Sequence, residues 1–113
     1  MIVTVTSIRL KSVWGYFKLT WLAMGIVKQT KIQAGFLEMK NRGFGYLHFT
    51  MTAWRSEADM QAFAHSGAHL EAMKSSPSLG QEFRFHTFES AEMPKWKEAE
   101  KALFEKGRVI TFR

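Results

Sequence analysis

The sequence has no cysteine, and this absence excludes several kinds of chemistry at once. Without a thiol, the chain can form no disulfide, no thiolate nucleophile and no cysteine-ligated zinc or iron–sulfur site. A chain without cysteine fits a reducing compartment, so we expect a cytoplasmic protein. Only two prolines are present, and we find no linker and no internal repeat. The sequence therefore predicts one domain over residues 1–113.

Long apolar runs are also missing. The longest strongly apolar run, from Trp21 to Val27, is far shorter than a membrane span. The first ten residues alternate apolar and polar side chains and lack the basic start of a signal peptide. The net charge is +6, but the basic residues are scattered or interleaved with glutamates, as on a solvated helix face. The sequence therefore predicts no membrane partner and no nucleic-acid partner.

Aromatic residues are abundant, at 14% of the chain, with Phe 10 and Trp 4. At this chain length folding buries roughly two-thirds of the surface of the unfolded chain, so one core can form without disulfides or metals. Aromatic side chains beyond the needs of that core can line an apolar ligand pocket or a subunit interface. The composition thus favours a globular domain that has a small apolar ligand or a second subunit.

The residue pattern predicts the order β-α-β-β-α-β, followed by α-β. The predicted strands cover residues 2–10, 32–40, 46–54, 81–88 and 109–112, and the helices begin after Ser12, after Ser56 and at Pro94. A turn over residues 41–45 joins the second and third strands into a hairpin. The first six elements predict an α+β fold of the ferredoxin-like, split βαβ type. Such a sheet carries helices on one face, so we expect its other face to pair with a second copy in a homodimer.

The first predicted helix is apolar around much of its circumference. Trp14, Phe17, Trp21 and Met24 recur at helical spacing, and further apolar residues lie beside them. Such a stripe is most often core. Because it exceeds what one sheet face can cover, it also favours a substrate pocket or a dimer seam.

The third predicted strand has one apolar and one mixed face. His48, Thr50, Thr52 and Trp54 share the mixed face, which suits the wall of a semi-polar cavity. If that face lines a cavity, His48 is a candidate for proton transfer. If the face meets a dimer interface, His48 is a hydrogen-bonding core residue.

The stretch from the third strand through the second helix carries a family resemblance. Its matching residues are Thr52, Trp54, Arg55, Ser56, Asp59, Met60, Phe63, Ala64, His69, Ala72 and Met73. In this pattern the chain resembles the spheroidene monooxygenase-like proteins of the dimeric α+β barrel superfamily. The resemblance implies a ferredoxin-like protomer that pairs through its sheet into a dimeric α+β barrel. It also implies oxygenation of an apolar substrate, with haem as a possible cofactor, although the residues themselves leave the cofactor open.

The second predicted helix holds the main candidate for catalysis. By the resemblance, His69 would ligate haem iron or act as a base, and its structural alternative is a hydrogen-bonded histidine at a helix edge. His65 and His69 have the spacing of a metal pair, but no third ligand is evident, so we expect no metal site. Trp54 could stack on a planar ligand or anchor the strand–helix junction. Arg55 could bind a carboxylate or a haem propionate, or could simply be solvated.

Two functions follow from these candidates. The first is a monooxygenase-like enzyme that acts on an apolar or aromatic substrate. Its catalytic residues would be His69 and His48, its cofactor-binding residues His69, Trp54 and Arg55, and its substrate pocket Trp14, Phe17, Trp21 and Phe63. The alternative is a non-catalytic ligand-binding or scaffold protein on the same fold.

Overall fold

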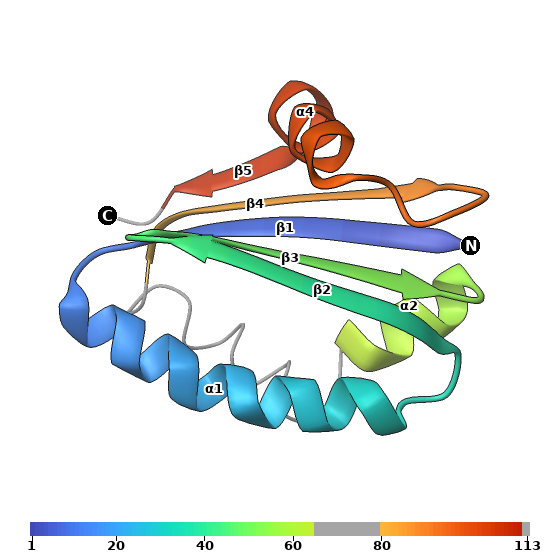
Figure 1. The fold of residues 1–113 in the computed structure, drawn as a ribbon, viewed down its shortest axis with the longest axis horizontal. Helices are drawn as coiled ribbons and strands as arrows, with labels where there is room; N and C mark the ends of the chain where they lie inside the picture. Colours follow the sequence, from blue (N-terminus) through green and yellow to red (C-terminus); the bar gives the residue numbers. More distant parts are fainter. Residues whose placement is uncertain (65–79, 112–113) are drawn as a thin grey trace.

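The computed structural model describes residues 1–64 and 80–111 as one five-stranded sheet with helices packed on it (Figure 1). The elements are β1 (Ile2–Leu10), α1 (Val13–Ile32), β2 (Phe36–Phe44), β3 (Leu47–Trp54), α2 (Glu57–Ala64), β4 (Gly80–Glu89), α4 (Trp96–Lys106) and β5 (Arg108–Thr111). This order confirms the predicted β-α-β-β-α-β plan and its α-β extension.

The strands lie side by side in the order β2-β3-β1-β4-β5, and every neighbouring pair is antiparallel. The first strand is therefore the central one. Its Thr4 pairs with Thr52 of β3 and with Thr87 of β4. Since β1 and β3 are neighbours although a helix and a strand separate them in sequence, this is the ferredoxin-like arrangement that the sequence predicts.

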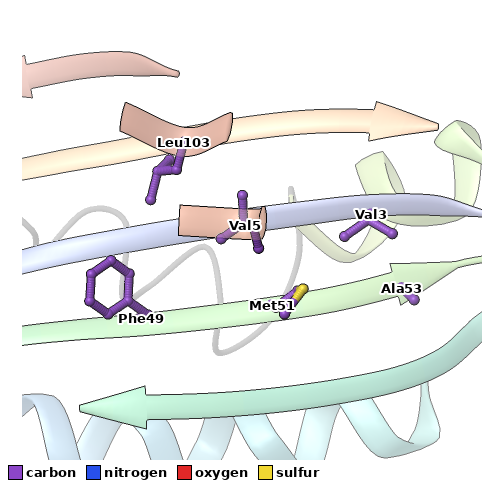
Figure 2. Close-up of a cluster of buried hydrophobic side chains, with 7 residues drawn as sticks. Val3, Val5, Phe49, Met51, Ala53 and Leu103 are labelled. Atoms are coloured by element: carbon purple, nitrogen blue, oxygen red, sulfur yellow. The ribbon is translucent and has the colours of Figure 1, made fainter. Parts of the chain in front are cut away.

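Helices lie on both faces of the sheet. Helices α1 and α2 cover one face, and α4 lies across the other, above β1 and β4 (Figure 1). On the α4 side, the buried core consists of Val3, Val5, Phe49, Met51, Ala53, Ala99 and Leu103. Figure 2 shows Leu103 reaching from α4 towards the strands that carry the other side chains.

The position of α4 corrects one expectation. The sequence suggests helices on one face only, with the second face left for another copy of the sheet. That suggestion is wrong in part, because the apolar side of α4 buries the alternate residues of β1 and β3 within the same chain. Ala99 and Leu103, which the sequence places on the apolar side of this helix, are both 0% exposed.

The first hairpin also differs from its predicted boundaries. Helix α1 continues to Ile32, so β2 begins at Phe36 rather than at residue 32. Gly35, with φ 84°, supplies the left-handed backbone between the two elements. Phe44 pairs with Leu47, so the turn is two residues, Gly45 and Tyr46, and the predicted turn residues before it are paired in the ladder.

The start of α2 follows the predicted cap. The backbone N–H of Asp59 donates to Ser56 Oγ over 3.2 Å, which satisfies one amide of the first turn. The Ser56 hydroxyl in turn donates to Asp59 Oδ2 over 3.0 Å. The two side chains therefore hold the junction between β3 and α2, where the candidate site begins.

Candidate functional site

Threonine residues line the sheet face that α1 and α2 cover. Alternation along each strand and the register place Thr4, Thr6, Thr50, Thr52 and Thr87 on this face, which we call the threonine face. Thr4 Oγ1 and Thr87 Oγ1 lie 3.0 Å apart, close enough for a hydrogen bond between neighbouring strands. Neutral hydroxyls in such rows can bind polar groups of a ligand while apolar side chains bind its rings.

Two further hydrogen bonds hold this face in place. Thr50 Oγ1 donates to Asn41 Oδ1 of β2 over 3.1 Å. Thr6 Oγ1 donates to the Thr50 carbonyl oxygen at a long 3.5 Å. Thr6 and Thr50 are half-buried, so their hydroxyls are partly shielded from water.

Trp54 ends the same face of β3 in an apolar cluster. Its indole lies against Phe63 of α2 with ring centroids 4.9 Å apart, and against Phe36 of β2 at 5.8 Å. Met60 and the half-buried Ile26 complete the cluster, so strand β3 meets both α1 and α2 at this tryptophan. The two predicted site residues Trp54 and Phe63 are thus in contact.

The indole N–H of Trp54 has no hydrogen-bond partner among residues 1–64 and 80–111. Trp54 is 0% exposed, and within the described ranges its Nε1 finds no acceptor. A buried donor without an acceptor costs about 1–3 kcal/mol, so such groups are rare in folded proteins. The packing role of Trp54 in the apolar cluster does not explain this buried donor.

Helix α1 is fastened to α2 near this cluster. Gln29 Nε2 donates to the Phe63 carbonyl oxygen over 3.3 Å. The hydroxyl of the fully buried Thr30 donates to the Ile26 carbonyl oxygen over 2.7 Å, so this polar group is satisfied within α1. The two helices therefore enclose the Trp54 end of the threonine face.

His48 lies at the opposite end of that face. Its side chain is half-buried, and its Nε2 is 3.0 Å from the carbonyl oxygen of Gly45 in the hairpin turn. The proton-transfer role remains a prediction, since the ring already contacts backbone oxygen. His86, by contrast, pairs with Val5 on the α4 side of the sheet and stacks on Phe88 with centroids 5.4 Å apart.

The remaining predicted site residues do not gather at this face. The side chain of Arg55 is exposed. Trp14, Phe17 and Trp21 are 81%, 60% and 76% exposed on α1, so within one chain they form an outer surface rather than part of the core. Their role in a substrate pocket remains a prediction. His69, together with His65, lies outside the described residues.

Haem does not fit the part of the chain that the structure describes. An axial ligand needs an accessible imidazole or a comparable donor. On the threonine face the described imidazole is that of His48, which is engaged at the hairpin, and Arg55 is exposed. A haem site would therefore depend on His69. Among residues 1–64 and 80–111, no group of three or more potential ligands could hold a metal ion.

Sequence reasoning missed part of this face. It identified Thr50 and Thr52, but not Thr4, Thr6, Asn41 or Thr87. The signal was present in two strands as threonines two residues apart, at positions 4 and 6 in β1 and at positions 50 and 52 in β3. Only the register of the strands shows that these pairs are neighbours.

Solved structures with this fold include oxygenases. No family model and no curated protein matches the sequence. The chain is similar to SnoaB, a cofactor-independent oxygenase from Streptomyces nogalater, with TM-score 0.64 and 10% identity over 83% of this chain and 97% of that one. It is also similar to an antibiotic biosynthesis monooxygenase, with TM-score 0.70 and 10% identity over 81% of this chain and 100% of that one.

A third similar structure is SO0527 from Shewanella oneidensis, with TM-score 0.69 and 16% identity over 97% of this chain and 92% of that one. These likenesses define the class of fold: an α+β, ferredoxin-like protomer of the kind found in antibiotic biosynthesis monooxygenases. At such low identity they show the fold alone. In the described ranges, no helix is both long and apolar enough to cross a membrane.

Proposed function

We propose that this protein is a small monooxygenase-like enzyme whose substrate is a planar aromatic molecule that carries an oxygen substituent. The observation that supports this most directly is the buried indole N–H of Trp54, which has no acceptor in the part of the chain that the structure describes. The fold shared with a cofactor-independent oxygenase gives independent support.

The substrate would bind between the threonine face and the two helices that cover it. Its rings would lie against the aromatic side chains beside Trp54, and its oxygen would accept the hydrogen bond of Nε1. Because Trp54 is 0% exposed, a substrate reaches this donor only when a neighbouring side chain moves. Met60 is the most adaptable member of the cluster, since its unbranched side chain repacks at low cost.

An N–H directed at the substrate oxygen favours the deprotonated substrate. In a dry site, a hydrogen bond to a charged oxygen is stronger than one to a neutral carbonyl, so it stabilises an enolate or phenolate more than its parent. Removal of a proton from a CH₂ group conjugated with that oxygen, directly or through an aromatic ring, leaves a carbanion whose electrons dioxygen can accept. The overall reaction converts CH₂ and O₂ into C=O and H₂O, and therefore needs no external reductant.

Two histidines are candidates for the proton acceptor. His48 is the described histidine on the threonine face, half-buried and tied to the hairpin turn. His69 is the other candidate, by the family resemblance. The enzyme would therefore use one of these two imidazoles as its general base.

The test is the substitution Trp54→Phe, which removes the N–H and keeps an aromatic ring. A suitable probe is anthrone, a tricyclic ketone with an activated CH₂ group. We expect Trp54→Phe to weaken binding of the anthrone enolate by roughly tenfold to a hundredfold, the value of one hydrogen bond to a charged group. Dioxygen uptake, measured with an oxygen electrode, should fall in parallel.

The matched control is Trp96→Phe, the same change at a half-buried tryptophan on the α4 side of the sheet. It should leave anthrone binding and oxygen uptake unchanged. Equal binding by the wild type and Trp54→Phe would refute the assigned donor. Binding without oxygen uptake would favour the alternative function, a non-catalytic ligand-binding protein.

Haem, the dimer and the location of the protein are separate proposals. A hemin titration followed at the Soret band, with His69→Ala beside the wild type, tests the cofactor that the resemblance implies. A homodimer through the part of the sheet that α4 leaves open, in a cytoplasmic protein, remains our expectation. Light scattering at micromolar concentration tests whether the protein is a homodimer.

A further inference from the structure

The outer side of α1 exposes an unusual number of large apolar side chains. Trp14, Trp21, Met24 and Ile32 are 81%, 76%, 66% and 86% exposed. The first three lie seven and three residues apart, so they share one side of the helix. Phe17, 60% exposed, lies between them and contacts Trp14 with ring centroids 6.3 Å apart. We call this surface the α1 outer face.

The charge of the α1 outer face has one sign. Helix α1 contains no aspartate or glutamate. Lys28 follows Met24 by one turn and Lys31 follows it by two, and both side chains are exposed. The whole chain is also basic, with a net charge of +6. A partner for this face must therefore accept exposed indoles and cations at the same time.

We propose that the α1 outer face binds the surface of a bilayer that contains anionic lipids. Indole rings prefer the boundary between headgroups and acyl chains, and lysines beside them reach the lipid phosphates with their long side chains. This proposal stands apart from the proposed reaction, because it uses none of the residues of the threonine face.

The setting of α1 suits a helix that lies flat in the interface. Its inner side is fixed to the sheet, where Ile26 packs against the Trp54 cluster and Thr30 is fully buried. The helix runs along the length of the sheet with its outer side at the edge of the molecule (Figure 1). Its whole outer side can therefore meet a plane at once.

A second copy of the chain is a poorer occupant of this face. In a two-fold dimer, the same patch faces itself, so α1 would meet α1. Lys28 and Lys31 of each copy would then pack against an α1 that has no acidic residue to neutralise them. Burying unpaired cations in an apolar contact is costly. An anionic surface removes this cost.

The linear sequence predicts no membrane contact because its lysines are scattered and its apolar runs are short. The helix changes that interpretation, because its periodicity gathers residues from positions 14 to 32 on one side. The apolar residues on its inner side conceal the pattern, since α1 is apolar on both sides. Only the exposure of each side chain in the folded structure separates the two sides of the helix.

The experiment measures binding to vesicles by co-sedimentation and by the emission wavelength of tryptophan. One vesicle is phosphatidylcholine alone, and the other contains about one third phosphatidylglycerol. We expect binding to the anionic vesicle, with a blue shift of emission, and a marked loss of binding in high salt. Lys28→Gln with Lys31→Gln should weaken binding roughly twenty-five-fold, since each lysine near the surface contributes roughly fivefold.

The variant Trp14→Ser with Trp21→Ser should lower binding more than roughly tenfold, because each indole offers on the order of 150 Å² for burial. Both residues are exposed, so circular dichroism should show an unchanged fold. The charge-matched control is Lys97→Gln with Lys106→Gln, two exposed lysines of α4. It should bind like the wild type.

Three results would overturn the proposal. The first is an absence of binding to the anionic vesicle at low salt. The second is a lack of charge specificity: the wild type binds both vesicles equally, or the α4 lysine control loses as much binding as the α1 lysine variant. The third is a dimer, detected by light scattering, that the Trp14→Ser, Trp21→Ser variant converts to monomer, since this would make a second copy the occupant of the face. The lysine variant keeps the test decisive if the tryptophan variant fails to fold.

Discussion

Leu103→Ala measures how firmly α4 is docked on the sheet. Leu103 is 0% exposed and packs with Val3, Val5 and Phe49 in the core on the α4 side. Loss of three buried carbon groups removes about 2.4 kcal/mol of transfer free energy. A residual cavity adds to this, and buried Leu→Ala changes in other proteins cost about 2.7–5.0 kcal/mol. We expect a loss of about 3 kcal/mol in the free energy of unfolding, because a single covering helix can move inward to fill part of the cavity.

The assay is urea unfolding followed by circular dichroism. A domain of this length typically has a stability of about 6–17 kcal/mol, so the variant should still fold, with a melting temperature lower by roughly 10–15 °C. Leu37→Ala is the matched control, since Leu37 is 45% exposed on β2 and the same substitution should cost less than about 1 kcal/mol. If Leu103→Ala cost no more than Leu37→Ala, α4 would not be docked in solution. The sheet face beneath it would then be open to a second copy.

Three further experiments test local features. Ser56→Ala removes the cap of α2 and should cost about 1 kcal/mol in urea unfolding, and an unchanged midpoint would contradict the cap. Gly35→Ala should lower the free energy of unfolding by well over 1 kcal/mol, because φ is 84° and the new methyl would collide with a side chain of α2. Gly45→Ala, where φ is 59° and the space is open, should lower it by only about 1 kcal/mol. Equal losses in the two variants would refute the collision. The Arg42–Glu100 ion pair, at 3.3 Å and with side chains 56% and 27% exposed, should show a coupling below about 0.5 kcal/mol in a double-mutant cycle, and a coupling above about 1.5 kcal/mol would mean that water is excluded from it.

Local patterns predicted the elements well where one physical signal dominates. The alternation of β-branched residues predicts β1 over Ile2–Leu10, which is the strand observed. Ser56 predicts the start of α2. The end of α1 was harder, because the residues around Ile32 suit a helix or a strand, and the backbone of Gly35 marks the break.

What the sequence could not predict is which surfaces meet. Helical spacing shows which side of α4 is apolar, but nothing in that spacing says which face of the sheet it covers. For the same reason, Trp54 and Phe63 were both predicted as site residues without any sign that their rings are in contact. The rows of threonine hydroxyls depend on strand register, and that register joins residues as far apart as Thr4 and Thr87.

The central position of β1 has a consequence for how the chain is made. Ile2 pairs with Trp54 on one side and with Glu89 on the other, so β1 can complete its second ladder only after the residues of β4 have been synthesised. At roughly 5–20 residues per second, both edges of this apolar strand wait several seconds for a partner. Long-range pairings of this kind also slow folding after release. We therefore expect nascent chains of this protein to depend on chaperones that shield Val3 and Val5 until β4 is complete.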